Sequence, residues 1–252
     1  MIKKLENKLI QYSSELNIDI NDLNILCSLS GGVDSTLMSS LLINLREKHN
    51  FNLILAHFNH KMHDISDEIE TFCTSFSAEN KIKLYIDSFH VPKGSNFESY
   101  SRSLRYKKLN KLSLDLDSSI IVTAHHCDDQ VETLYMKRLD NADWISRIGI
   151  REYYGILRRP FLDVSKQEIV NCANKINLNW IEDPSNKYLN IRRNNIRKII
   201  LPEIKNKNSN IDLELLTESR KYLKKMNRCF DEFNKNKNEL ILKETEYFVS
   251  TK

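Results

Sequence analysis

Glycine is scarce in this chain, which has only 5 among its 252 residues, whereas globular proteins contain about 7%. The sequence also has only 4 prolines and 5 cysteines. Successive cysteines are at least 45 residues apart, so the chain has no CxxC motif that would indicate a zinc site or a redox pair. We therefore expect isolated, reduced thiols. Two of the five glycines are adjacent, Gly31 and Gly32, and this pair is the first candidate for a functional loop.

Long apolar runs are absent as well. No run approaches the ~20 residues that a membrane-spanning helix needs, and the opening MIKKLENKLIQYSSE lacks the apolar core and cleavage site of a signal peptide. We expect a cytoplasmic protein with no membrane partner. Hydrophobic residues make up 40% and charged residues 29%, which excludes collagen-like and mostly disordered chains. The net charge of 38 − 34 = +4 permits a nucleic-acid partner without requiring one.

Short apolar runs alternate with longer amphipathic stretches from residue 23 to about residue 125. The predicted strands are 24–29, 53–58, 83–86 and 119–124, and the predicted helices are 35–46, 66–80, 99–114 and 128–137. Because the strand candidates are continuously apolar, we predict a buried parallel sheet with helices on both faces, an α/β Rossmann-like fold. Ser66 is expected to cap its helix, and Ser165 with Glu168 forms a capping box for a helix that ends near residue 176.

The residue pattern of the sequence changes after Pro184. Residues 188–202 form a basic amphipathic segment that we expect Pro202 to stop, and residues 211–235 are typical of one long helix. We therefore predict a catalytic domain over residues 1–203. A small helical appendage with a partly disordered tail is expected over residues 204–252.

The glycine pair lies between an apolar strand and a helix, in the string Ser30, Gly31, Gly32, Val33, Asp34 and Ser35. A strand, a glycine turn and a helix together are typical of a phosphate site, because the backbone can approach an anion and the first helical N–H groups point at it. The Asp34 carboxylate would repel a phosphate group directly. Its presence in the loop therefore indicates that it faces a metal counter-ion or an electrophilic group. A tight turn without ligand is the alternative. Walker A and GxGxxG motifs are absent, so an ordinary P-loop kinase or a dinucleotide oxidoreductase is not indicated.

Three further clusters carry candidate functional residues. Asp129 and Glu132 follow the fourth strand and share one helical face, which suits Mg²⁺ or an ammonium group, although acids at the start of a helix can also be purely structural. Arg102 and Arg105 share a helical side with an aromatic residue and could hold phosphates or form a solvated basic face. The arginines of the fourth cluster, which include Arg192 and Arg197, fit phosphate contacts or a basic surface helix.

The string SGGVDS resembles the pyrophosphate loop of the N-type ATP pyrophosphatases. Four more strings follow it in order: HFNHKMH at 57–63, NFESYSRSLRY at 96–106, AHHCDDQVET at 124–133, and EDPSN with RNNIR after it. Together they resemble the tRNA(Ile)-lysidine synthetase family over about residues 24–202. This resemblance implies ATP-dependent attachment of lysine to C2 of the wobble cytidine in tRNA(Ile) with a CAU anticodon. The reaction passes through an adenylated tRNA and releases pyrophosphate and AMP.

The resemblance also implies roles for individual residues. ATP, with Mg²⁺ as counter-ion through ligands left unassigned, would be held by Ser30, Gly31, Gly32, Val33, Asp34 and Ser35. Catalytic roles fall to Asp34, Asp129, Glu132 and Arg197, and substrate binding to His57, His60, Arg102, Arg105, Asp129, Glu132, Arg192 and Arg197. The partners are tRNA(Ile) with a CAU anticodon and L-lysine, and the oligomeric state is left open between a monomer and a homodimer.

The sequence departs from the family pattern at three places. The stretch 138–144 lacks the family's glycine-rich loop, the stretch 59–63 keeps only His60, and about 50 residues after Pro202 leave room for no more than a helical appendage. Two alternatives therefore stay open. One is a tRNA sulfurtransferase of the same superfamily, a chemistry that commonly uses paired cysteines. The other is a non-catalytic nucleotide- or RNA-binding module.

Overall fold

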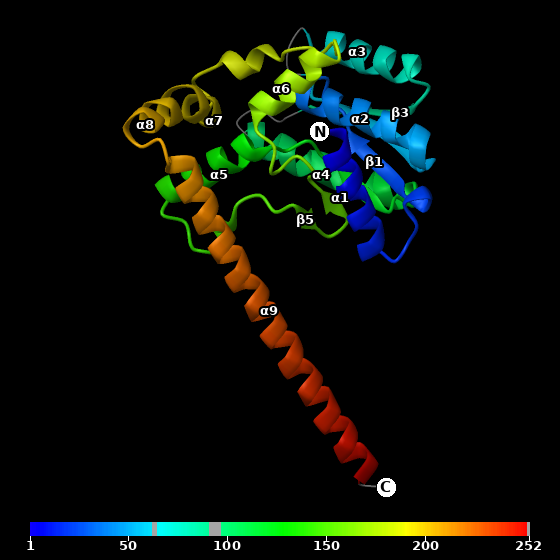
Figure 1. Cartoon of the computed structure of the whole chain (residues 1–252), viewed down its shortest axis with the longest axis vertical. Coiled ribbons are helices and arrows are strands. Elements are labelled where there is room, and N and C mark those ends of the chain that lie inside the picture. The colour runs from blue at the N-terminus through cyan, green and yellow to red at the C-terminus, as the bar shows by residue number, and fades with distance from the viewer. Residues whose placement is uncertain (62–64, 91–96, 251–252) are drawn as a thin grey trace. The chain divides into compact units, whose positions relative to one another are not determined.

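The computed structural model describes residues 1–61, 65–90 and 97–250, and for residues 97–99, 236 and 238–250 it describes the backbone alone (Figure 1). The strands are β1 (Asn24–Ser28), β2 (Asn52–Asn59), β3 (Lys83–Ser88), β4 (Ile120–Val122), β5 (Tyr153–Tyr154) and β6 (Leu157–Arg158). The helices are α1 (Ile2–Glu15), α2 (Val33–His49), α3 (Ser66–Glu79), α4 (Phe97–Asp115), α5 (Cys127–Leu139), α6 (Lys166–Lys175), α7 (Arg192–Asn195), α8 (Leu201–Lys207) and α9 (Ile211–Ser250). Single 3₁₀ turns lie at Ile20–Asp22, Ser146–Ile148 and Pro184–Lys187, and a π turn lies at Ile196–Ile200.

The strands form one sheet in the order β3-β2-β1-β4-β6-β5. Every neighbouring pair is parallel except β5 with β6, a short antiparallel pair at the edge. In the centre, Ile25 lies opposite Leu53 of β2 and Ile120 of β4. The predicted α/β fold with a mostly parallel sheet is confirmed.

Helices cover both faces of this sheet because successive strand residues point to opposite sides. In β1, Ile25 and Cys27 face one core, which α1, α2, α3 and α6 complete. Leu26 faces the other core, where it packs with Leu109 and Leu112 of α4. The buried residues of β1 and β4 are apolar, whereas β2 ends in the buried polar residues His57 and Asn59.

Three local predictions were wrong. β3 is largely exposed, since it is an edge strand paired only with β2. Ser66 is the first residue of α3, and Ile65 takes the N-cap position. Pro202 does not stop the basic segment; the backbone stays helical from the π turn into α8, and Pro202 lies in the first turn of α8.

The N-terminal helix α1 was not predicted from the sequence. Its buried residues Leu5, Leu9 and Tyr12 recur at helical spacing. Their apolar side packs in the same core as α2. The periodicity was therefore present in the sequence, within a segment otherwise rich in lysine and glutamate.

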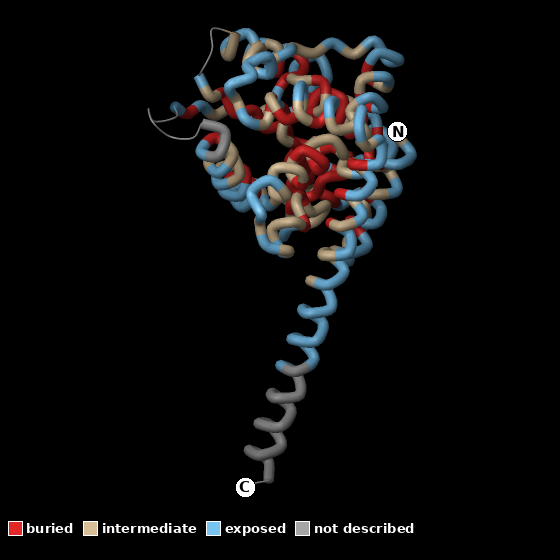
Figure 2. Tube along the Cα trace, turned by 90° about the vertical axis from the view of Figure 1, so that its left-hand side faces the viewer, coloured by how far each residue is buried: buried red, intermediate tan, exposed pale blue. Residues whose placement is uncertain are grey.

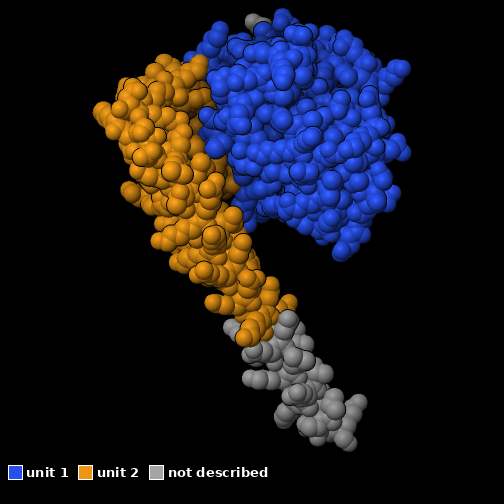
Figure 3. All heavy atoms as spheres, viewed as in Figure 1, with its two compact units in different colours: residues 1–129, 151–188 blue, residues 130–150, 189–252 orange. Residues whose placement is uncertain are grey.

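The chain divides into two compact units, coloured separately in Figure 3. The α/β unit comprises residues 1–129 and 151–188, and the helical unit comprises residues 130–150 and 189–252. The helical unit has its own apolar core, to which α5 contributes Val131 and Leu134, and α9 contributes Ile211 and Leu215. Figure 2 shows that the described part of α9 beyond this core is mostly exposed. The predicted domain boundary after residue 203 stays a prediction.

Among the residues that the structure describes, no helix combines the length and the apolar composition needed to cross a membrane.

Candidate functional site

The glycine loop joins the carboxyl end of β1 to the start of α2. Gly31 has a φ of +81°, and a Cβ atom there would lie 2.8 Å from Ile69 Cγ2, so both the backbone and the packing require glycine. Gly32 is the N-cap of α2 with an ordinary φ of −77°, and a Cβ there would meet only Ser30 Oγ, at 3.8 Å. The space outside Gly32 is therefore open, beside the first N–H groups of α2, which is the arrangement that an approaching anion needs.

Two serines hold the ends of this loop together. The Ser35 hydroxyl donates to the Gly32 carbonyl at 3.1 Å and accepts from the Ser30 amide at 3.0 Å. The Ser30 and Ser35 hydroxyl oxygens are 2.9 Å apart. Since the proton of the Ser35 hydroxyl points to the Gly32 carbonyl, the Ser30 hydroxyl is the donor in the contact between the two hydroxyl groups. The loop is thus shaped by its own hydrogen bonds, and Ile181 N–H adds another to the Gly31 carbonyl at 3.0 Å.

Asp34, in the first turn of α2, is paired with Lys166. The Lys166 ammonium lies 2.6 and 2.8 Å from the two Asp34 carboxylate oxygens. His126 Nε2 lies 3.8 Å from Asp34 Oδ2 and 3.5 Å from Asp129 Oδ2. The carboxylates of Asp34 and Asp129 therefore meet at one buried imidazole within the α/β unit.

The start of α6 is fixed in a way that places Lys166. Ser165 and Glu168 form the predicted capping box. The Lys166 amide donates to Asp128 Oδ2 at 2.7 Å, and the Cys127 amide donates to the Val164 carbonyl at 2.8 Å. The first residues of α5 and α6 are thus tied together, and the lysine side chain extends from that junction to Asp34.

The carboxylates beside the glycine loop could bind Mg²⁺ in one way, as one or two ligands of an ion that also binds waters and phosphates. Within the described ranges, no group of three or more His, Cys, Asp or Glu side chains is arranged to hold a metal ion. Mg²⁺ commonly binds through one or two carboxylates, with waters and substrate phosphates completing its octahedron. Asp34 and Asp129, which face the same imidazole, could supply those carboxylates when a nucleotide brings the phosphates.

A second cluster in the α/β unit is rich in arginine. The guanidinium carbons of Arg102, Arg105 and Arg159 lie 5.4, 5.7 and 6.0 Å from the ring centre of Tyr106. His125 is held next to them, with Nδ1 3.0 Å from Thr123 Oγ1 and Nε2 3.4 Å from Arg102 Nη1. Because a guanidinium can only donate, His125 accepts at Nε2 and carries its proton at Nδ1. The predicted pair Arg102 and Arg105 is thus brought together with Arg159.

Burial and positive charge shift the pKa values in this arginine cluster. Burial, reinforced by Arg102 and Arg105, holds the pKa of His125 well below its usual range. Burial also lowers the pKa of Arg105. The pKa of Tyr106 is lowered as well: burial alone would raise it, and the neighbouring Arg102 and Arg159 outweigh burial. A neutral imidazole beside several guanidinium groups makes the cluster strongly attractive to an anion.

His57 and His60 lie at the end of β2 and just beyond it. His57 is 4% exposed, with Nδ1 3.0 Å from the Leu29 carbonyl, and its buried Nε2 has no hydrogen-bond partner in the part of the chain that the structure describes. Burial lowers its pKa. The ring of His60 packs edge-on against Phe89 at 4.7 Å, and burial lowers its pKa to about 4. Both imidazoles are therefore neutral at pH 7. The contact with His57 helps to fix Leu29, the residue directly before the glycine loop.

Glu132 is the centre of an ion-pair cluster in the helical unit. Its side chain is 2% exposed and accepts from Arg193 Nε at 2.8 Å and from Arg197 Nε at 2.5 Å. Arg197 Nη2 adds a contact of 2.9 Å, which makes that pair bidentate. Two of the arginines in the fourth sequence cluster thus converge on one buried carboxylate of α5.

Arg192 points elsewhere. Its Nη2 lies 2.5 Å from Asp140 Oδ1, in a pair that is half exposed on both sides. Asp140 lies in the stretch 138–144, where the sequence lacks the family's glycine-rich loop. The local sequence around 192–197 contains no acid, so these partners could not be foreseen from it.

Sequence reasoning missed Lys166 and Arg159 as site residues. Lys166 is the first residue after a serine cap, a position that carries no functional signal. Arg159 follows β6, a strand of two residues that is too short for its periodicity to be recognised. The strings that begin at residues 57 and 96 include residues 62–63 and 96, which lie outside the described residues.

Comparison with curated proteins finds relatives over most of the chain. A tRNA(Ile)-lysidine synthase of Streptococcus equi subsp. equi (strain 4047) is 34% identical over 218 residues, which cover 84% of this chain and 48% of that protein. One from Bacillus cereus is 31% identical over 231 residues, covering 85% of this chain and 48% of that protein. The chain thus spans about half the length of the curated relatives it matches.

Solved structures show the same fold. The U34-tRNA thiolase NcsA from Methanococcus maripaludis, with its [4Fe-4S] cluster, aligns with a TM-score of 0.68 at 17% identity, covering 88% of this chain and 79% of that one. The family model for the PP-loop domain matches residues 2–204. Because this match covers more than half of the residues, the chain belongs to the PP-loop domain family.

Proposed function

We propose that this chain attaches lysine to C2 of the wobble cytidine of tRNA(Ile) with a CAU anticodon, with cleavage of ATP to AMP and pyrophosphate in the cytoplasm. The observation that carries the proposal is the similarity to proteins named tRNA(Ile)-lysidine synthase over 84% of the chain. The loop geometry supports the ATP part, because Gly32 leaves open space beside the N–H groups at the start of α2.

In the proposed first step, the O2 atom of the cytidine attacks the α-phosphorus of ATP, and pyrophosphate leaves. The chain's part is to hold the phosphates and offset their charge. The loop amides would donate hydrogen bonds to the phosphates. The Ser30 and Ser35 hydroxyls would do so by exchanging their hydrogen bonds within the loop for phosphate oxygens. Asp34 and Asp129 would hold Mg²⁺, which supplies charge neutralisation when it is bound. Lys166, at 2.6 Å from Asp34, is close enough to exchange its carboxylate partner for a phosphate oxygen.

In the proposed second step, the ε-amine of lysine attacks C2, the C2–O bond to AMP breaks, and the ammonium proton is lost. In the family motif, an acidic pair receives the incoming ammonium, and Asp129 and Glu132 are one helical turn apart on α5. Glu132 would have to exchange its contact with Arg193 for the ammonium. The bidentate contact from Arg197 supports a positioning role for that arginine, because it fixes the Glu132 carboxylate.

The arginine cluster suits the RNA. Arg102, Arg105 and Arg159 surround an aromatic ring, and such a combination can hold a backbone phosphate while a base stacks nearby. His57 and His60, both neutral, would line the approach from β2. Arg192 would contact RNA only by giving up its exposed pair with Asp140, a pair worth little in water.

The decisive assay mixes purified protein, Mg-ATP, labelled lysine and the tRNA, and follows label transfer together with AMP and pyrophosphate. We expect label in the tRNA, one AMP per lysine, and loss of both signals in Asp34→Ala. Release of ADP or orthophosphate, or transfer that survives Asp34→Ala, would contradict the proposal. Dependence on sulfide in place of lysine would favour a sulfurtransferase, and binding of ATP and RNA without AMP formation would favour a non-catalytic module.

A further inference from the structure

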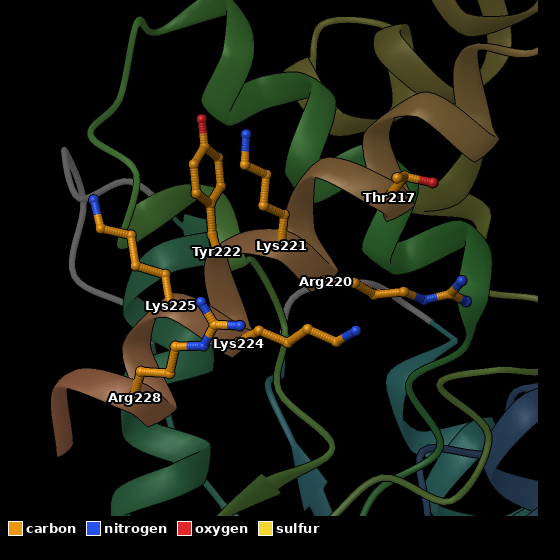
Figure 4. A pocket seen from close by; sticks show the side chains of 7 residues that line it. All are labelled: Thr217, Arg220, Lys221, Tyr222, Lys224, Lys225 and Arg228. Atoms are coloured by element: carbon orange, nitrogen blue, oxygen red, sulfur yellow. The ribbon is translucent and has the colours of Figure 1, made fainter. Parts of the chain in front are cut away.

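The helix α9 carries an array of cations that the proposed reaction does not use. Between residues 217 and 228 it has five basic residues and one acid. At about 100° per residue, the five fall within roughly 140° of the helix circumference. They are exposed, and they line a hollow along the helix together with Thr217 and Tyr222 (Figure 4). We call Arg220, Lys221, Lys224, Lys225 and Arg228 the cationic face of α9.

Local acids do not neutralise this face. Among the described side chains, no carboxylate forms an ion pair with Arg220, Lys221, Lys224 or Arg228. Glu218, the acid within the segment, is already held by Arg138 at 2.8 Å and by Arg147 at 3.4 Å. Asp231 and Glu232 lie on the same side of α9, one turn beyond Arg228, so they weaken the field at that end of the face. The field of the remaining cations is not cancelled locally, and it attracts a polyanion.

An aromatic pair stands beside the cations. The rings of Trp144 and Tyr222 are 6.2 Å apart and tilted by 48°. The ammonium of Lys225 lies 4.3 Å from the centre of the Trp144 ring, so a cation–π contact orients that lysine. Interleaved cations and aromatic rings are typical of nucleic-acid-binding surfaces, where rings pack against sugars or bases while cations meet phosphates.

A membrane surface fits this helix less well. Basic amphipathic helices bind bilayers by inserting a free apolar side. In the first turns of α9 that side is occupied, because Ile211, Leu215 and Ser219 are buried within the helical unit. Between residues 217 and 228 the helix therefore offers a partner mainly charge. Phe230 and Phe233 expose apolar surface beyond this segment, and for that reason the test below includes lipid vesicles.

We propose that the cationic face of α9 binds the phosphate backbone of folded RNA, without reading its sequence. The face extends about 12 Å from Arg220 to Arg228, at 1.5 Å per residue, a length that meets roughly three phosphates of one duplex strand. The inference rests on the proposed function in the choice of tRNA as the RNA. It assigns a role in substrate capture to a helix that carries none of the family motifs.

The test measures tRNA affinity of the full chain across salt from about 50 to 200 mM. Each phosphate contact adds about 0.7 to 0.9 to the slope of log K against log salt. The triple variant Arg220→Gln, Lys224→Gln, Arg228→Gln should therefore lower the slope by about 2 to 3. Affinity should fall to the same extent for the CAU tRNA and for an unrelated tRNA, because the contacts carry no base information.

The matched control removes three exposed lysines from the α/β unit, Lys3→Gln, Lys83→Gln and Lys175→Gln, and so changes net charge equally. Its slope should stay within about 0.5 of the parent value. Equal losses in both triple variants would overturn the proposal, since net charge alone would then explain binding. Binding to phosphatidylserine vesicles that is lost in the α9 variant while tRNA binding is kept would also overturn it.

Two further arms make the result unambiguous. A charge-keeping variant, Arg220→Lys with Arg228→Lys, should retain the parent slope, and an unchanged thermal midpoint in all variants shows that they fold. If lysidine does not form but the slope changes as expected, the proposed function fails and the RNA face stands. If lysidine forms and the slope of the α9 variant does not change, the RNA face is wrong and the proposed function stands.

Discussion

Gly31 and Gly32 are adjacent but are glycines for different physical reasons. Gly31 has a φ of +81° and a packed neighbour, Ile69, at 2.8 Å from a would-be Cβ. Gly32 has neither constraint. We expect Gly31→Ala to lower the free energy of unfolding by about 1 to 3 kcal/mol. Gly32→Ala should leave it within about 0.5 kcal/mol and raise the Kd for ATP about tenfold, because its methyl group would occupy the open space of the loop.

Urea unfolding and ATP titration on the same two variants check this assignment. The two variants serve as controls for each other, since they make the same chemical change one residue apart. Equal stability losses would contradict the packing argument for Gly31. Unchanged ATP affinity in Gly32→Ala would contradict the idea that the loop needs open space for an anion.

Lys166 is the cation that holds Asp34, and we expect it to matter for ATP cleavage more than for stability. Its pair with Asp34 is partly exposed, at 40% and 28%, so Lys166→Gln should cost no more than about 1 kcal/mol of stability. AMP formation should fall at least tenfold, since the phosphates would lose a positioned ammonium. The control is Lys4→Gln, which breaks another exposed pair, to Asp163 at 3.0 Å. Equal AMP formation in both variants would exclude this role for Lys166.

Individual site residues differ in how far the sequence could predict them. The glycine loop, Asp34 and the acids of α5 were visible because each lies in a compact string. Lys166 was not, because its partner lies 132 residues away. The same holds for Arg159, which meets Tyr106 across 53 residues. Pairing of this kind is decided by the fold, and a local pattern does not contain it.

At the scale of elements, Gln130 ties α5 to two other segments of the helical unit. Its side chain is buried, donates to the Ile148 carbonyl at 2.9 Å and to Ser219 Oγ of α9 at 3.2 Å, and accepts from the Ile150 amide at 2.6 Å. Gln130→Ala would leave a buried amide and a buried carbonyl with fewer partners. We expect a loss of about 2 to 4 kcal/mol in the free energy of unfolding.

Ser219→Ala provides the graded comparison. The Ser219 hydroxyl donates to the Ile148 carbonyl at 2.8 Å, which also accepts from Gln130, so only about 1 kcal/mol should be lost. Chemical denaturation of both variants tests the order. A larger loss for Ser219→Ala than for Gln130→Ala would show that Gln130 is not the centre of this junction.

The buried Glu132 joins α5 to the arginine-rich segment, and its charge is fully matched. Glu132→Gln would leave the guanidinium groups of Arg193 and Arg197, which are 15% and 38% exposed, without a carboxylate, so we expect about 2 to 3 kcal/mol of destabilisation. Asp140→Asn removes an acid from the exposed pair with Arg192 and should cost less than about 1 kcal/mol. Thermal unfolding of the two variants measures the contrast. Similar losses would mean that burial does not set the strength of these pairs.

Helix boundaries show where local rules were sufficient and where packing overrode them. The capping box at Ser165 was predicted and is present, since both of its hydrogen bonds lie within four residues. Pro202 was expected to end a helix and instead lies in the first turn of α8, directly after the π turn Ile196–Ile200. A π turn widens the helix and changes which carbonyls need partners, and no local pattern in the sequence indicates it.

At the scale of the whole molecule, the sheet was predictable because its central strands are apolar on both faces. Ile25, Leu26 and Cys27 fill two cores from one strand, and that pattern excludes a half-exposed sheet. The division into two units was not predicted in this form. The helical unit combines residues 130–150 with the chain after residue 188, and the apolar faces that make this core lie more than 60 residues apart in α5 and α9.

Acid should destabilise the fold through its buried histidines. Burial, with Arg105 and His57 adding to it, lowers the pKa of His60 from 6.5 to about 4. In the unfolded chain, His60 binds a proton below about pH 6.5, whereas in the folded chain it does so only below about pH 4. The free energy of unfolding therefore decreases as the pH falls from about 6.5 to about 4. From pH 7 to pH 5 this one group accounts for roughly 2 kcal/mol.

The variant His60→Gln isolates that contribution, because glutamine does not titrate. Urea unfolding at pH 7 and pH 5 should show that the variant loses less stability on acidification than the parent, by roughly 2 kcal/mol. His90→Gln, at an exposed position, should behave like the parent. Parallel losses in all three proteins would mean that acid acts through other groups. A smaller loss confined to His60→Gln would show that its burial is what keeps the imidazole neutral.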